Sequence, residues 1–212
     1  MPHPSSEHLF EEALNLLSIA IFVIDSDHKV IWMNRRGRLL VDSKNGILMT
    51  SGRLRGETTT QTREIDEVLE RTIVRQPQAD RERVVLARPL ARRSGGQPLR
   101  LVAVAGRGAP PAADPAKPSH DPFSILYVGD DEAHRVGHPE LLRALFGLTP
   151  TEARIAAAVA NGLSLAEVAG ELRLGMGTVR WHAKRILSRT ETSRQAELVR
   201  MILLSPLGFL AI

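Results

Sequence analysis

The chain has 212 residues, a formal net charge of +4 and no cysteine. That length has room for two modest domains, and an isoelectric point of about 10.1 favours an anionic partner. The lack of cysteine excludes a disulfide framework and thiol chemistry. The apolar run at 14–24 is too short to span a bilayer, so we expect a cytoplasmic protein that does not enter a membrane.

The first 128 residues mix strand and helix patterns. We expect helices over 6–17, 35–42 and 59–75, and strands over 19–25, 30–34, 83–90, 99–105 and 123–128. A hairpin turn is predicted at 26–29, and a second turn between 47–48 and 53–55. The proline-rich stretch 106–122 is interpreted as a loop inside the domain.

This order of elements resembles that of PAS sensor domains. The segment IAIFVIDSDHKVIWMN (19–34) carries the resemblance, because such domains begin with an aliphatic strand, an acidic turn and a strand that ends in Asn. The resemblance covers 6–128 and implies a small antiparallel sheet with helices over one face, acting as a sensor or dimerisation domain.

The same resemblance limits what such a domain could hold. A flavin photosensor of this kind needs an adduct-forming cysteine, and haem-binding members use a histidine on the longer helix; the chain has no cysteine and 59–75 has no histidine. No cofactor is predicted. Two alternatives stay open, namely an unidentified apolar small molecule, or no ligand and a purely dimerising domain.

Residues 129–140 are predicted to link two domains. Carboxylates and histidines gather there, but no helix fixes their spacing, so a polar hinge is favoured over a metal site. Upstream, a series of arginines on the late strands is interpreted as a solvated sheet face, with auxiliary DNA contact as the minor alternative. These are Arg81, Arg83, Arg88, Arg92, Arg93, Arg100 and Arg107.

Two capping boxes mark helix starts in the C-terminal part. Each is a hydroxyl residue followed three positions later by Glu, and the pairs are Thr149 with Glu152 and Ser164 with Glu167. The first helix is expected over 153–161, where Gly162 ends it. Gly175 and Gly177 are expected to permit the sharp turn that precedes a third helix.

The third helix, predicted over 178–189, is apolar on one face and basic on the other. Val179, His182, Ala183 and Ile186 recur at helical spacing and form the expected buried stripe. Arg180, Trp181, Lys184 and Ser188 fall on the opposite face, with Arg185 and Arg189 along its flank. Such a helix suits the major groove of a duplex, where cations neutralise phosphates and guanidinium groups pair with guanine.

These residues resemble the DNA-binding domain of the LuxR (GerE, NarL) regulators. The matching stretches are GTVRWHAKRI at 177–186 and RQAELV at 194–199. The resemblance implies a four-helix domain over 141–212 that binds DNA and commonly dimerises through its fourth helix, here 193–204. It places Arg180, Trp181 and Lys184 at positions that contact bases and phosphates, and Thr178 at a backbone contact.

The resemblance has local departures. His182 matches a position that packs inside the module, so we interpret it as a core residue. Gly175 stands where the family has Ser at the third helix's N-cap, which weakens the cap only slightly. Trp181 is bulkier than the usual small aliphatic residue, so the base preference is expected to differ from the family's.

The sequence therefore predicts an α+β protein, with a PAS-like domain at 6–128 followed by an all-α helix-turn-helix domain. We expect a transcription regulator and not an enzyme. Its predicted partners are double-stranded DNA and a second copy of the chain, with RNA polymerase as a further candidate. Arg185 and Arg189 are expected to hold phosphates. In the alternative interpretation, the helix-turn-helix contacts a partner protein and Trp181 is an interface hot spot.

Overall fold

The computed structural model describes residues 6–74, 85–106, 122–131, 136 and 138–210. The chain divides into two compact units, Met1–Ala133 and His134–Ile212. That division falls inside the stretch predicted as a linker. Among the described residues, no helix has the length and apolar character needed to cross a membrane.

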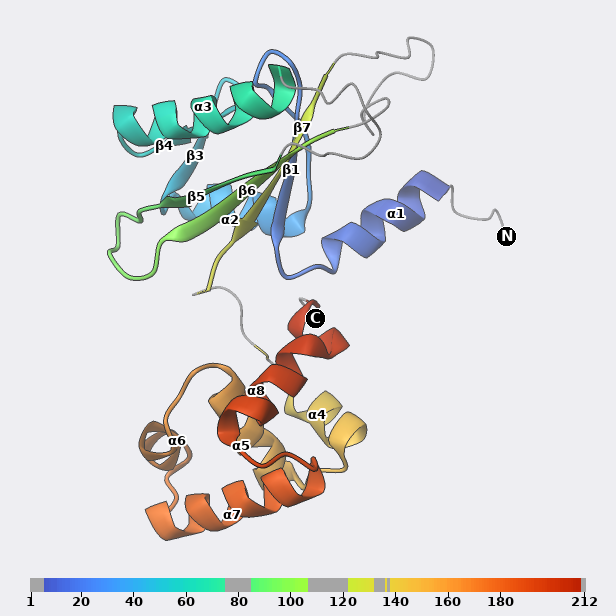
Figure 1. Cartoon of the computed structure of the whole chain (residues 1–212), viewed down its shortest axis with the longest axis vertical. Coiled ribbons are helices and arrows are strands. Elements are labelled where there is room, and N and C mark those ends of the chain that lie inside the picture. The colour runs from blue at the N-terminus through green and yellow to red at the C-terminus, as the bar shows by residue number, and fades with distance from the viewer. Residues whose placement is uncertain (1–5, 75–84, 107–121, 132–135, 137, 211–212) are drawn as a thin grey trace. The chain divides into compact units, whose positions relative to one another are not determined.

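The first unit is built on a five-stranded antiparallel sheet in the order β2-β1-β7-β6-β5 (Figure 1). Its strands are β1 (Ala20–Ile24), β2 (Val30–Met33), β5 (Val85–Leu90), β6 (Leu99–Ala105) and β7 (Ser124–Gly129). The helices are α1 (Ser6–Asn15), α2 (Arg35–Ser43) and α3 (Thr59–Val74), and β3 (Ile47–Thr50) pairs with β4 (Arg53–Gly56) in a separate hairpin. The predicted antiparallel sheet with helices is confirmed.

One face of this sheet carries the core. Successive side chains of a strand point to opposite faces, so Phe22 of β1 and Leu126 of β7, which pair in register, lie on the same side. They pack in one buried cluster with Leu54 of β4 and with Ile65 and Leu69 of α3. The hairpin, α2 and α3 therefore cover this face (Figure 1).

Asn34, which follows β2 and is the N-cap of α2, is fully buried, and both its side-chain oxygen and its side-chain nitrogen form hydrogen bonds. Its Oδ1 accepts hydrogen bonds from the backbone N of Ile21 at 3.0 Å and of Gly37 at 2.9 Å. Its Nδ2 donates to the carbonyl oxygens of Leu14 at 3.0 Å and Ile19 at 2.9 Å. One side chain thus fastens the end of α1, strand β1 and the start of α2, which explains in physical terms why the motif ends in Asn.

The arginines of the late strands depart from the prediction of a solvated face. The Arg92 side chain is only 2% exposed; it pairs with Asp130 and donates from Nε to the Gln97 carbonyl oxygen at 2.7 Å. Arg100 forms a bidentate pair with Asp131, with N–O distances of 2.5 and 2.6 Å. The prediction is wrong for Arg92, because a carboxylate just beyond β7 compensates its burial. Arg88 and Arg93 are exposed, and Arg81, Arg83, Arg107 and the loop at 107–121 lie outside the described residues.

The second unit is helical. It contains α4 (Pro139–Phe146), α5 (Pro150–Ala160), α6 (Leu165–Leu172), α7 (Met176–Arg189), α8 (Gln195–Leu204) and the 3₁₀ turn η1 (Pro206–Gly208). Its core joins Leu142, Ile155, Val168, Val179 and Ile202, one residue from each of the five α-helices. The predicted all-α domain is confirmed. Its first helix, α4, begins two residues before 141, where the helix-turn-helix domain was expected to start.

Both predicted capping boxes are present. Gly162 has a φ of +90°, which suits the residue that ends α5. The turn between α6 and α7 differs from the prediction. Its left-handed residue is Arg173, with a φ of +54°, whereas Gly175 is extended and serves as the N-cap of α7. Gly177 already lies inside that helix, so the paired glycines do not make the turn.

Candidate nucleic-acid interface

Helix α7 is half embedded in the helical unit and half exposed, as its sequence pattern predicts. Val179 and Ile186 are buried in the core. His182 is half-buried; its Nδ1 has no hydrogen-bond partner among the described residues, and its ring packs edge-on against Trp181 at 4.8 Å. His182 therefore packs on the inner side of the helix, in agreement with its interpretation as a core residue.

The outer face of α7 presents cations to solvent. Thr178, Arg180 and Lys184 are exposed. Within the described part of the chain, neither Arg180 nor Lys184 has an ion-pair partner. These two charges are therefore available to an anion that approaches α7, without the cost of breaking an existing pair.

Trp181 lies beside these cations with 53% of its surface exposed. The guanidinium carbon of Arg185 is 4.7 Å from the centroid of the indole ring, a distance at which a cation and a ring attract. An aromatic ring with a stacked guanidinium can make apolar contact with a thymine methyl group while the cation meets a phosphate. The arrangement also limits the rotamers of both side chains.

Arg185 and Arg189 share one buried carboxylate. Glu152, at the start of α5, has a side chain only 1% exposed. Arg185 Nε donates to Glu152 Oε1 at 3.2 Å, and Arg189 Nε lies 3.4 Å from Oε2. Arg189 also donates from Nη1 to the Gly147 carbonyl oxygen at 3.0 Å. Glu152 thus orients both guanidinium groups from the α5 side, and both arginine side chains remain partly exposed to solvent.

The pKa of Glu152 reflects this setting. Burial raises it, but hydrogen bonds from the backbone and side chain of Thr149, the charge of Arg189 and the hydrogen bond from Arg185 together lower it below the ordinary value. Glu152 is therefore ionised at neutral pH. The same carboxylate completes the capping box, since Oε2 accepts from Thr149 N at 2.9 Å.

Helix α8 carries a second surface feature. A shallow groove runs along its exposed side and is largely apolar. Its lining residues are Gln195, Ala196, Val199, Arg200, Leu203 and Leu204. Leu204 is 61% exposed, which is unusual for a large aliphatic side chain next to a continuous apolar strip.

A comparison with protein families decides what this helical unit is. Residues 147–202 match the model described as bacterial regulatory proteins, luxR family. The helical unit is a LuxR-type helix-turn-helix domain. This match supports DNA binding in transcription regulation, and it includes the whole of α7. The match starts just before the capping box of α5 and ends within α8.

No curated protein sequence matches the chain. Among solved structures, the Vibrio cholerae VqmA dimer without target DNA is similar at 15% identity and a TM-score of 0.38, covering 97% of this chain and 90% of that one. A Vibrio cholerae VqmA–ligand–DNA complex is similar at 14% identity and a TM-score of 0.39, covering 97% of this chain and 90% of that one. A phage VqmA–DPO complex is similar at 18% identity and a TM-score of 0.38, covering 94% of this chain and 89% of that one. Fewer than a fifth of the aligned residues are identical in each case.

Sequence reasoning overlooked one part of the interface. Glu152 was expected only as a capping residue, because its arginine partners lie 33 and 37 positions further along the chain. The available signal was a glutamate at the first turn of one helix together with arginines at i and i+4 of a later one. That signal needs the packing of α5 against α7 to become informative.

Proposed function

We propose that this chain is a dimeric transcription regulator that reads duplex DNA through α7 and is controlled by its sheet domain. The observation that carries the proposal is the exposed basic face of α7, with Arg180 and Lys184 beside Trp181, on a LuxR-type domain. A helix of this kind enters the major groove with its N-terminal residues toward the bases.

The proposed roles follow from position and charge. Arg180, Trp181 and Lys184 contact base edges and nearby phosphates and set sequence preference. Arg185 and Arg189, held by Glu152, contact phosphates on the flank. Thr178, at the start of the helix, contacts the sugar–phosphate backbone.

Dimerisation of the DNA-binding domain is assigned to the apolar groove of α8. Placing two recognition helices about one helical turn apart requires a two-fold pair of domains, and an exposed apolar strip is the surface such a contact buries. Ala196→Arg puts a charge on this strip at an exposed position. It is expected to shift sedimentation toward the monomer, whereas Gln97→Arg, on an exposed turn of the other domain, leaves the association unchanged.

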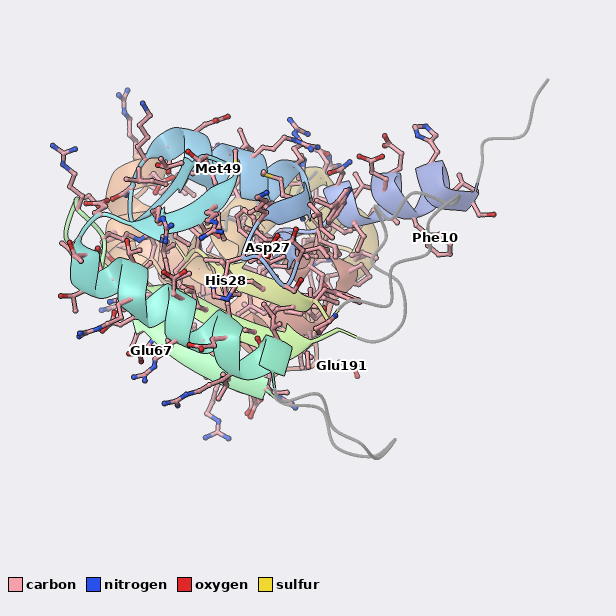
Figure 2. The ribbon with its side chains drawn as sticks, turned by 90° about the horizontal axis from the view of Figure 1, so that it is seen from above. Phe10, Asp27, His28, Met49, Glu67 and Glu191 are labelled. Carbon is pink, nitrogen blue, oxygen red and sulfur yellow. The ribbon has the colours of Figure 1, made fainter. Side chains whose placement is uncertain are left out.

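The sheet domain, a PAS-like domain in our proposal, offers a second contact. On the sheet face turned away from α3, Val104 of β6 and Ile125 of β7 form a half-buried cross-strand pair. A face of an antiparallel sheet that meets only solvent would carry polar residues at these positions. Helix α1 adds Phe10, which is 71% exposed and stands out from its helix (Figure 2). We propose that a second copy covers these surfaces.

Control by the sheet domain is proposed as a population shift, in which its state changes how the two DNA-binding domains are presented. A shallow cavity of about 100 Å³ beside α2 is smaller than the ~300–1,000 Å³ of pockets that hold small ligands. This favours control through dimerisation over control by a ligand at that cavity. We place the protein in the cytoplasm, with RNA polymerase as a further proposed partner.

The direct test is selection of bound fragments from genomic DNA with the full chain at low salt. Enrichment of duplexes that share a two-fold motif is the expected result. Enrichment of nothing, together with a protein partner whose binding is lost in Trp181→Ala, would favour the alternative in which α7 contacts a protein.

A further inference from the structure

The end of the sheet domain is fixed immediately after its last strand. β7 ends at Gly129, and the next two residues are held by ion pairs to other parts of the sheet domain. Asp130 pairs with the buried Arg92, which lies just after β5. Asp131 pairs with both terminal nitrogens of Arg100 on β6. The backbone therefore stays attached to the sheet domain as far as residue 131.

The helical domain is fixed equally close to its own beginning. Val136 is 2% exposed and belongs to the helical core. The side chain of Asn161, the residue after α5, forms hydrogen bonds with both backbone polar groups of Val136. Val136 N donates to Asn161 Oδ1 at 2.8 Å, and Asn161 Nδ2 donates to the Val136 carbonyl oxygen at 3.2 Å. These two bonds attach residue 136 to a helix that packs directly against α7.

We infer that Asn161 and the Arg92–Asp130 and Arg100–Asp131 pairs act as positioning residues that shorten the connection between the domains to the four residues 132–135. The inference rests on the proposed function, since its consequence is for paired DNA-binding domains. Five backbone steps therefore separate residue 131 from residue 136. A dimer of sheet domains then holds two recognition helices at a high effective concentration relative to each other.

The first test measures the anchor without DNA. In the full chain, the Val136 amide should exchange its hydrogen slowly, because it is buried and bonded to Asn161. Asn161→Ala should accelerate that exchange by tenfold or more, and Asn161→Asp, which keeps an acceptor oxygen, should retain most of the protection. Exchange of Val136 at the rate of an unprotected amide in the wild type would overturn the inference, whatever the protein binds.

The second test lengthens the connection. Fifteen residues of Gly-Gly-Ser repeats inserted after Ala133 raise the number of backbone steps from five to about twenty. Because effective concentration falls roughly as the −3/2 power of length, affinity for a genomic duplex with two half-sites should drop about eightfold. Affinity for a shorter duplex with one half-site should not change.

The control replaces residues 132–135 by Gly-Ser-Gly-Ser at equal length, and it should bind both duplexes like the wild type. An insertion variant that binds the two-half-site duplex as tightly as the wild type would overturn the inference. A wild-type chain without duplex affinity would instead defeat the proposed function, and the exchange measurement would still decide whether the anchor exists.

Discussion

Arg185 and Glu152 join α7 to the first turn of α5, with Nε donating to a carboxylate oxygen at 3.2 Å. The carboxylate is buried and the guanidinium is partly exposed. Glu152 is therefore the member of the pair that lies in the protein interior, and Arg185 is the member that a phosphate could reach. Because Arg189 pairs with the same carboxylate, Glu152 balances the charge of two cations from the α5 side, while both arginine side chains remain partly exposed.

Replacing Glu152 by Gln removes the charge that both arginines face and keeps the shape of the side chain. We expect a loss of about 1–2 kcal/mol in the free energy of unfolding, because hydrogen bonds to charged groups are stronger than neutral ones while partial exposure of the arginines reduces the effect. Urea unfolding of the full chain measures it. Glu171→Gln, at an exposed position on α6, is the matched control, and equal losses in the two variants would contradict the assigned role.

The ionised side chain of Glu197 is expected to stabilise the helical domain and to lose this effect when the pH becomes acidic. Hydrogen bonds from the backbone and side chain of Ser193 and from Arg194 lower its pKa to about 2. A carboxyl group whose pKa is lowered in the folded state contributes stability that is fully present above its unfolded pKa of 4.5 and is lost as pH falls toward 2. Glu197→Gln should therefore lose stability relative to the wild type at pH 6, with the difference shrinking between pH 4.5 and 2. A difference that stays constant over that range would show that the charge of Glu197 is not responsible.

Trp181 should report directly on duplex binding. The chain has two tryptophans, so Trp32→Phe leaves Trp181 as the only one. Because Trp181 is half exposed, groove entry should remove water from its ring and change its emission on titration with a selected duplex. In an otherwise wild-type chain, Trp181→Ala should change stability by no more than about 0.5 kcal/mol, as for other surface substitutions, while reducing discrimination between selected and random duplexes. Unchanged discrimination would remove Trp181 from the interface.

The sequence was most informative where structure depends on near neighbours. The capping boxes Thr149–Glu152 and Ser164–Glu167 need only four consecutive residues, and both form as expected. The exposed setting of Trp181 follows from helical spacing alone. These features are determined within one or two turns of helix.

Long-range pairing was the part that sequence alone did not provide. Arg92 is buried because Asp130, 38 positions later, lies beside it, and no local pattern distinguishes it from the exposed Arg93. The turn before α7 depends on Arg173 adopting a positive φ, which a residue-type rule assigns to glycine. The role of Asn161 likewise requires knowing that Val136 lies next to the end of α5.

The salt dependence of duplex binding by Lys184→Ala tests the central claim most directly. The logarithm of the association constant should fall linearly with the logarithm of salt concentration, and loss of one phosphate contact should reduce the slope by about one unit. Arg63→Ala, on an exposed part of α3, should keep the wild-type slope. Identical slopes for the wild type and Lys184→Ala, at equal folded stability, would contradict the assignment of α7 as the surface that reads DNA.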